Sequence, residues 1–210
     1  MRLRTMRSQA SYAAITAVVA FAALVLTYGD AGALQPCKKY EKDVRRYHHQ
    51  YFGLDFPYEY SIAQLYTESL CRGGMMSSDG IGSQGPAQIT FGVWREKLEK
   101  EGIQEINSIS SHLRAQAYIN RLSYDQAKCK KLFVLYQLYN GGPIVNSEIQ
   151  RAGSCDWASA YKACKRKDIK FKNGQTINAC TINYDYSKKI FDFAEEMRKE
   201  RANTGDYEFW

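Results

Sequence analysis

The stretch from Gln64 to Thr90 reads QLYTESLCRGGMMSSDGIGSQGPAQIT. It begins with the end of an apolar-striped segment and continues into a loop that holds five of the fifteen glycines of the chain. It closes with a short apolar piece, and Glu68 lies at the point where a helix would end. The pattern predicts a helix that leads directly into a glycine-rich loop, where backbone can approach a ligand closely.

Glu68 has neighbours that favour a raised carboxyl pKa. Ile62, Leu65, Tyr66 and Leu70 flank it at helical spacing. Desolvation by such side chains keeps an acid protonated closer to neutral pH, which suits it to donate a proton to a leaving oxygen. The alternative interpretation is a solvated glutamate at a helix end, followed by an ordinary surface turn.

Two motifs follow one another along the chain. The first is Glu68-Ser69, then the loop, then Gly82-Ser83-Gln84-Gly85-Pro86-Ala87-Gln88-Ile89, and the second is Tyr139-Asn140-Gly141-Gly142-Pro143. Their order resembles the soluble lytic transglycosylases, a goose-lysozyme-like family with Glu-Ser, Gly-Ala-x-Gly-Leu-Met-Gln-Ile and Tyr-Asn-Ala-Gly-Pro. The resemblance covers roughly residues 57–149, and Pro86-Ala87 replaces the Leu-Met of the family.

The resemblance implies cleavage of the β-1,4 bond between N-acetylmuramic acid and N-acetylglucosamine in peptidoglycan. Glu68 would first act as an acid on the glycosidic oxygen and then as a base on the muramic C6 hydroxyl, which leaves a 1,6-anhydro end. The family uses the acetamido group of the substrate to stabilise the cationic centre, in place of the second carboxylate of ordinary glycosidases. No metal or cofactor is expected.

The resemblance also assigns roles to other positions. The substrate-binding positions are Gln88, Tyr139, Ser77, Ser78 and Asn140. Gln88 would line the glycan cleft, whereas Asn140 is better interpreted as a cap that holds its loop. Tyr139 would hydrogen-bond Glu68 or the acetamido group, with a core tyrosine on an apolar helix as the alternative. The motif positions expected to support the fold are Ser69, Gly82, Gly85, Ile89 and Gly142.

Asp79 supports a rival hypothesis. Goose-type lysozymes share the implied fold and carry an aspartate nine residues before the motif glutamine, as Asp79 stands before Gln88. Such a carboxylate could activate water, which would make the protein a muramidase that hydrolyses the same bond. We favour the simpler interpretation of Asp79 as a turn residue before Gly80. A third hypothesis is a non-catalytic wall-binding protein on the same scaffold.

Residues 1–33 have the pattern of a secretory signal peptide. Three arginines precede a mostly apolar run at residues 13–27, and Ala31-Gly32-Ala33 is a small-residue cleavage site. The apolar run is short for a membrane span, although an uncleaved anchor is the alternative. We therefore expect an exported protein that is periplasmic or extracellular after cleavage near Ala33, in contact with the membrane only through this segment.

The chain that remains after cleavage is mildly basic. Residues 34–210 hold 26 basic and 21 acidic residues, a net charge of +5, and their one dense basic run is Lys165-Arg166-Lys167 with Lys170 and Lys172. No nucleic-acid-binding module is recognisable. The charge favours an anionic polymer such as the cell wall as partner, or serves solubility alone. We expect a monomer, with a secretion or wall-remodelling apparatus as a further candidate partner.

The cysteine pattern predicts disulfides. An even number of cysteines after an export signal allows up to three disulfides, with fifteen pairings that the sequence does not distinguish. A zinc site is disfavoured because Cys-x-x-Cys is absent and the three histidines lack ligand spacing. Cys71, if paired, would tether the start of the glycine-rich loop. The six cysteines are Cys37, Cys71, Cys129, Cys155, Cys164 and Cys180.

The periodicity predicts one mainly helical, lysozyme-like α+β domain over residues 34–210, stapled by disulfides, with a C-terminal extension at 155–210. Helices are expected at residues 38–51, 57–68, 91–100, 108–122, 129–139, 157–164 and 184–201. Asn173-Gly174 predicts a small β-hairpin between residues 169 and 177. The aromatic tail at residues 207–210 has no assigned role.

Overall fold

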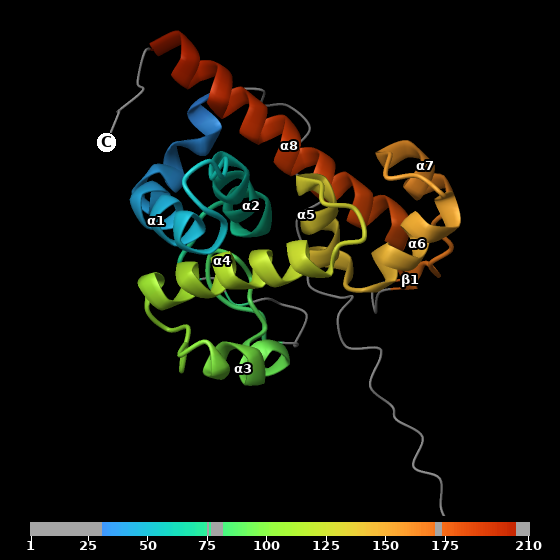
Figure 1. The fold of residues 1–210 in the computed structure, drawn as a ribbon, viewed down its shortest axis with the longest axis horizontal. Coiled ribbons are helices and arrows are strands. Elements are labelled where there is room, and N and C mark those ends of the chain that lie inside the picture. Colours follow the sequence, from blue (N-terminus) through green and yellow to red (C-terminus); the bar gives the residue numbers. More distant parts are fainter. Residues whose placement is uncertain (1–30, 75, 77–81, 171–173, 205–210) are drawn as a thin grey trace, which may run out of the picture.

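The computed structural model describes residues 31–74, 76, 82–170 and 174–204 (Figure 1). Most of the predicted signal peptide, the loop residues Ser77, Ser78 and Asp79, the hairpin residue Asn173 and the aromatic tail therefore lie outside the described residues.

Helices dominate the described part of the chain, as the sequence predicts. It contains eight α-helices, a preceding 3₁₀ segment η2 (Ala31–Tyr40) and one two-stranded antiparallel hairpin. The helices are α1 (Glu41–Phe52), α2 (Glu59–Ser69), α3 (Phe91–Lys100), α4 (Ile109–Gln126), α5 (Leu132–Gly141), α6 (Ile144–Ala152), α7 (Trp157–Lys162) and α8 (Ala179–Thr204). The strands β1 (Ile169–Lys170) and β2 (Thr176–Ile177) form the predicted hairpin, with Ile169 opposite Ile177.

The long helix α8 organises the packing. It runs along one side of the molecule and packs against both α2 and α5, while α1 packs against α4 (Figure 1). At the end of the molecule where α8 begins, α6, α7 and the hairpin form a smaller group. None of the described helices combines the length and apolar character that a membrane crossing requires. Because α8 contacts α2 and α5, the C-terminal extension packs directly on the segments that carry both motifs.

The helix α5, expected at residues 129–139, is buried in its middle, since Val134, Leu135 and Tyr136 have no exposed surface. Its neighbour α6 was missed because Gly141-Gly142-Pro143 was interpreted only as the end of a helix. Pro143 has φ −61° and stands at the N-cap of α6. Proline suits the start of a helix because its φ is already near the helical value and a missing N–H costs nothing there.

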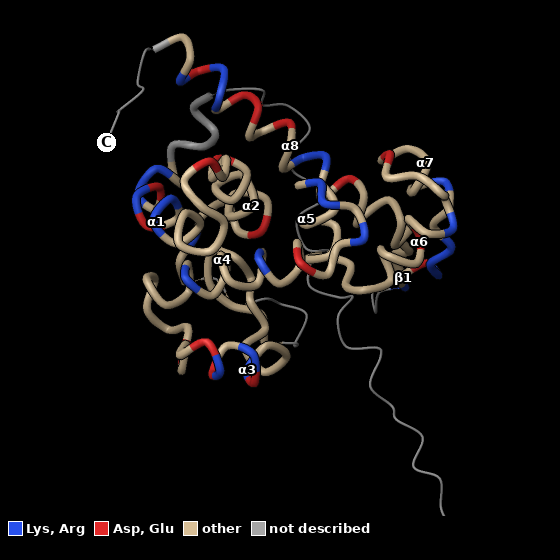
Figure 2. The backbone as a smooth tube through the Cα atoms, viewed as in Figure 1, with Lys and Arg blue, Asp and Glu red and all other residues tan. Residues whose placement is uncertain are grey.

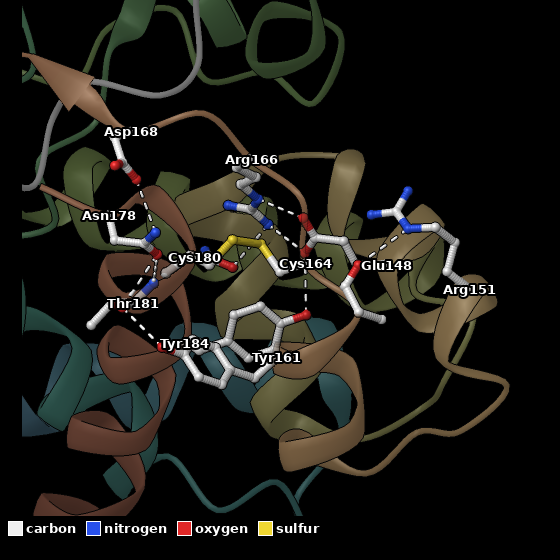
Figure 3. Close-up of a disulfide and its surroundings, with 12 residues drawn as sticks. Glu148, Arg151, Tyr161, Cys164, Arg166, Asp168, Asn178, Cys180, Thr181 and Tyr184 are labelled. Carbon is white, nitrogen blue, oxygen red and sulfur yellow. Dashed lines mark hydrogen bonds and ion pairs between the residues drawn. A yellow bond between two sulfur atoms is a disulfide. The ribbon is translucent and has the colours of Figure 1, made fainter.

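All six cysteines form disulfides, with the pairs Cys37–Cys71, Cys129–Cys155 and Cys164–Cys180. The first joins η2 to the residue that follows the C-cap of α2, as expected for a tether of the glycine-rich loop. The third joins the segment after α7 to the start of α8 (Figure 3). Three disulfides indicate a protein that folds in an oxidising compartment outside the cytoplasm.

The dense basic run at residues 165–167 is not exposed throughout. Lys165 and Lys167 are exposed, but the side chain of Arg166 is only 5% exposed and that of Glu148 is fully buried. Arg166 donates from Nε and Nη2 to the two carboxylate oxygens of Glu148, each at 2.7 Å, and Tyr184 donates to Glu148 Oε2 at 3.1 Å (Figure 3).

Lys and Arg positions are frequent along the backbone around α6, α7 and β1 (Figure 2). The Glu148–Arg166 pair joins α6 to the segment between α7 and β1, and both side chains are held by two hydrogen bonds in a fork geometry. It therefore fixes the smaller group of elements from within.

Candidate functional site

Glu68 lies in the last turn of α2 and is partly buried. Its Oε1 accepts a hydrogen bond of 2.6 Å from the hydroxyl of Tyr186 on α8. Burial raises the pKa of Glu68 to about 8, and the Tyr186 hydrogen bond opposes this rise because it stabilises the charged form. The raised pKa agrees with the prediction from its apolar neighbours, so Glu68 holds its proton at neutral pH.

The chain turns sharply after Glu68. Leu70 and Cys71 both have positive φ angles, 53° and 59°, which non-glycine residues rarely adopt. The Cys37–Cys71 disulfide secures this turn. The hydroxyl of Ser69 donates to Pro86 O at 2.8 Å, which joins the end of α2 to the second part of the motif. Ser69 therefore has the structural role that was expected of it.

The residues from Ser83 to Thr90 form a compact turn. The backbones of Gln84 and Ile89 exchange two hydrogen bonds, of 3.1 and 3.0 Å. Gly85 has φ +70° at the bend, and Gln88 has φ +48°. The side-chain amide of Gln88 donates to Gly85 O at 2.8 Å. Gln88 therefore contributes to the shape of the turn in this structure, in addition to its predicted contact with the glycan.

Tyr139 lies near Glu68 but its hydrogen bond goes elsewhere. Its hydroxyl donates to Ala87 O at 2.8 Å, across 52 residues of sequence. Burial and then the charge of Glu68 raise the pKa of Tyr139 well above its ordinary value, so it stays protonated. The hydrogen bond to Glu68 that the sequence suggested for Tyr139 is made by Tyr186 instead.

Tyr186 was missed because it lies outside both motifs, 118 residues after Glu68. A signal was nevertheless present in the sequence. Tyr186, Ile190 and Ala194 recur at every fourth position, and all three are buried on the face of α8 that packs inward. A tyrosine on such a face usually finds a hydrogen-bond partner for its hydroxyl.

Asn140 and Gly142 hold the second motif in place. Asn140 Oδ1 accepts from Asn183 Nδ2 at 2.9 Å, and Arg166 donates to Asn183 Oδ1 at 3.2 Å. Gly142 ends α5 with φ +70°. The interpretation of Asn140 as a cap agrees with these contacts, which connect the motif to the buried Glu148–Arg166 pair.

His112 is a second residue that the sequence analysis missed. The backbone N–H of Ala87 donates to His112 Nε2 at 3.1 Å, while Tyr139 binds the carbonyl of the same residue at 2.8 Å. Burial lowers the pKa of His112 to about 4, so the ring is neutral and its Nε2 can accept the hydrogen bond from Ala87. The Ala87 residue is therefore held from both sides, by α4 and by α5.

The described residues contain no group of three or more His, Cys, Asp or Glu side chains that could hold a metal ion. No family model, no characterised protein and no solved structure matches this chain. The function is therefore inferred from the site residues themselves. Together they place Glu68, a carboxyl with a raised pKa, near a hydrogen-bonded turn, the buried Tyr186 and the partly buried Tyr139.

The geometry of the turn gives a stability prediction for Gly85→Ala. A Cβ atom at Gly85 would lie 2.5 Å from the His112 ring, and φ +70° already disfavours a side chain there. We expect the free energy of unfolding to fall by about 1–3 kcal/mol, measured by chemical denaturation. Gly92→Ala is the matched control, because nothing lies within 4 Å of its added Cβ on α3. Equal stability of the two variants would contradict the packing of His112 against the turn.

Proposed function

We propose that the protein is a peptidoglycan lytic transglycosylase in which Glu68 serves as both acid and base. The observation that carries the proposal is the Glu68 carboxyl, whose pKa of about 8 keeps it protonated at neutral pH. It begins the first of the two motifs whose order resembles this family. The contacts of the turn with Ser69 and with Tyr139 support the proposal because they join both motifs around the acid.

In the first step, Glu68 donates its proton to the glycosidic oxygen as the bond from that oxygen to C1 of the muramic residue breaks. A carboxyl with a pKa near the working pH is suited to general acid catalysis. The departing N-acetylglucosamine leaves with the proton. The acetamido group of the muramic residue stabilises the positive charge that develops at C1, so no second carboxylate is required.

In the second step, the Glu68 carboxylate removes the proton of the C6 hydroxyl as the C6 oxygen bonds to C1. The carboxyl is thereby restored, and no water is consumed. Tyr186 assists the intermediate stage, since its hydrogen bond to Glu68 Oε1 stabilises the carboxylate form. We further propose that residues 34–210 act outside the cytoplasm after removal of the signal peptide, which the three disulfides support.

Mass spectrometry of the products tests this proposal. Purified peptidoglycan is digested with a protein of residues 34–210, and the muropeptides are analysed at their muramic ends. We expect 1,6-anhydromuramic ends, one water lighter than hydrolysed ends. Reducing ends would instead establish a muramidase and make Asp79 the next residue to mutate. Intact peptidoglycan at all conditions would overturn both enzymatic assignments and favour a wall-binding protein.

A further inference from the structure

A cluster of buried polar side chains lies behind Glu68 and has no part in the chemistry described so far. It comprises His48, Gln64, Gln116 and Asn120, and each of the four is fully buried. Gln64 stands one helical turn before Glu68 on α2, so the two side chains share a face of the helix. Buried amides without full hydrogen bonding are costly, which calls for a physical reason for their presence.

Backbone carbonyls fix the direction of every hydrogen bond in this cluster. His48 Nδ1 lies 2.9 Å from Val44 O, and a carbonyl can only accept, so Nδ1 carries the proton. Burial lowers the pKa of His48 to about 4, so its other nitrogen, Nε2, is an acceptor. The atom of Asn120 that lies 3.2 Å from His48 Nε2 must therefore be the amide nitrogen.

The same reasoning orients Gln116. Its Nε2 lies 3.0 Å from Ser61 O, which again can only accept. Two amide nitrogens of known orientation then meet one atom of Gln64, since Gln116 Nε2 and Asn120 Nδ2 each lie 2.8 Å from it. That atom must be the oxygen, Oε1. The Gln64 amide nitrogen therefore points away from the cluster.

The Gln64 nitrogen is the amide atom that Gln116 and Asn120 leave unused. It is buried and makes no hydrogen bond of ordinary length with the described residues. It interacts with Tyr186: burial and then the charge of Glu68 raise the pKa of Tyr186 well above its ordinary value, and the side chain of Gln64 opposes this rise. An N–H group beside a phenol can only face the oxygen lone pairs, which leaves the phenol proton for another acceptor. Tyr186 gives that proton to Glu68 Oε1 at 2.6 Å.

We propose that Gln64 is a positioning residue, oriented by Gln116 and Asn120, which turns the Tyr186 hydroxyl so that it donates to Glu68. The role of Gln64 in catalysis rests on the proposed function. A Tyr186 hydroxyl that is fixed as a donor stabilises the Glu68 carboxylate that is left after the first proton transfer. A tyrosine free to rotate would offer this hydrogen bond only part of the time. The titratable groups that interact with Glu68 among the described residues are Tyr139 from α5 and Tyr186 from α8.

The pKa of Glu68 tests the proposal without any substrate. It is measured by carbon-detected NMR of the labelled carboxyl in the wild type, Gln64→Met, Tyr186→Phe and the double variant. Methionine keeps the length of glutamine but donates no hydrogen bond. We expect Gln64→Met to raise the pKa of Glu68 by about half a pH unit or more, and Tyr186→Phe to raise it further. The double variant should match Tyr186→Phe alone, because Gln64 acts through the tyrosine.

Gln137→Met is the matched control, since Gln137 is another fully buried glutamine on α5 that does not hydrogen-bond to this cluster through its side chain. Its replacement should leave the pKa of Glu68 unchanged. The proposal is overturned if Gln64→Met has no effect, if its effect adds to that of Tyr186→Phe, or if Gln137→Met produces the same shift.

A measurement on the unaltered protein covers the case in which Gln64→Met does not fold. A nuclear Overhauser contact is expected between the Gln64 side-chain amide protons and the Tyr186 hydroxyl proton, and its absence would also overturn the proposal. If the coupling is found but the protein cuts no peptidoglycan, the proposed function fails while the Gln64–Tyr186–Glu68 arrangement stands.

Discussion

Replacement of Glu68 with glutamine is expected to abolish cleavage of peptidoglycan. Glutamine keeps the shape of the side chain and can still accept from Tyr186, but it has no proton to transfer in either step. We expect the rate of muropeptide release to fall at least about a thousandfold, within the range attributed to general acid–base catalysis. Release from purified peptidoglycan, followed by chromatography, measures the loss.

The same substitution is expected to stabilise the fold at alkaline pH. The pKa of Glu68 is about 8 in the folded protein and ordinarily about 4.5, so between these values the folded state binds more protons than the unfolded state. The free energy of unfolding therefore falls as pH rises through this window. Glutamine does not titrate, so the Glu68→Gln protein does not lose stability in this way as pH rises. We expect its free energy of unfolding to exceed that of the wild type by about 1–3 kcal/mol at pH 8.5 and to be nearly equal to it at pH 4.5.

Glu99→Gln is the control for both effects, because Glu99 is an exposed glutamate on α3. It should keep full activity and show no stabilisation at alkaline pH. Full activity in Glu68→Gln would refute the role of Glu68 as the acid. A gain in stability that is the same at pH 4.5 and pH 8.5 would refute the raised pKa.

Replacement of Arg166 with methionine is expected to destabilise the fold strongly. It leaves the fully buried Glu148 without its two charge-assisted hydrogen bonds of 2.7 Å. Loss of one partner of a buried ion pair costs about 3–5 kcal/mol, because the remaining charge stays in a poorly solvating interior. For a domain of this size the melting temperature should fall by about 10 °C.

Lys165→Met is the matched control, since Lys165 precedes Arg166 in the same basic run but is exposed. It should change the melting temperature little, as surface substitutions usually do. Comparable destabilisation by the two substitutions would contradict the buried position of Arg166. Because Arg166 also donates to Asn183, which binds Asn140, the Arg166→Met protein should lose part of its activity even at temperatures where it remains folded.

Local pattern was sufficient to predict much of the fold. The helix at residues 91–100 has the predicted bounds, and α2 ends one residue after Glu68, because apolar spacing and glycine positions act over a few residues. The hairpin at residues 169–177 also follows from a local turn signal. By contrast, α6 was hidden by Pro143, which can either end one helix or begin the next.

The contacts that the sequence did not reveal join distant segments. Tyr186 reaches Glu68 across 118 residues, and no short motif records such a contact. The three disulfides are one choice among the fifteen that six cysteines allow, and only the fold selects it. Arg166 shows a further limit, because a run of three basic residues does not indicate which of them points inward.

The direct test of the central claim is an NMR titration of the Glu68 carboxyl in the wild-type protein, with the signal assigned by its loss in Glu68→Gln. We predict a midpoint near pH 8, because burial outweighs the Tyr186 hydrogen bond. A midpoint below about pH 5, the range of solvated glutamates, would contradict the assignment of Glu68 as a catalytic acid.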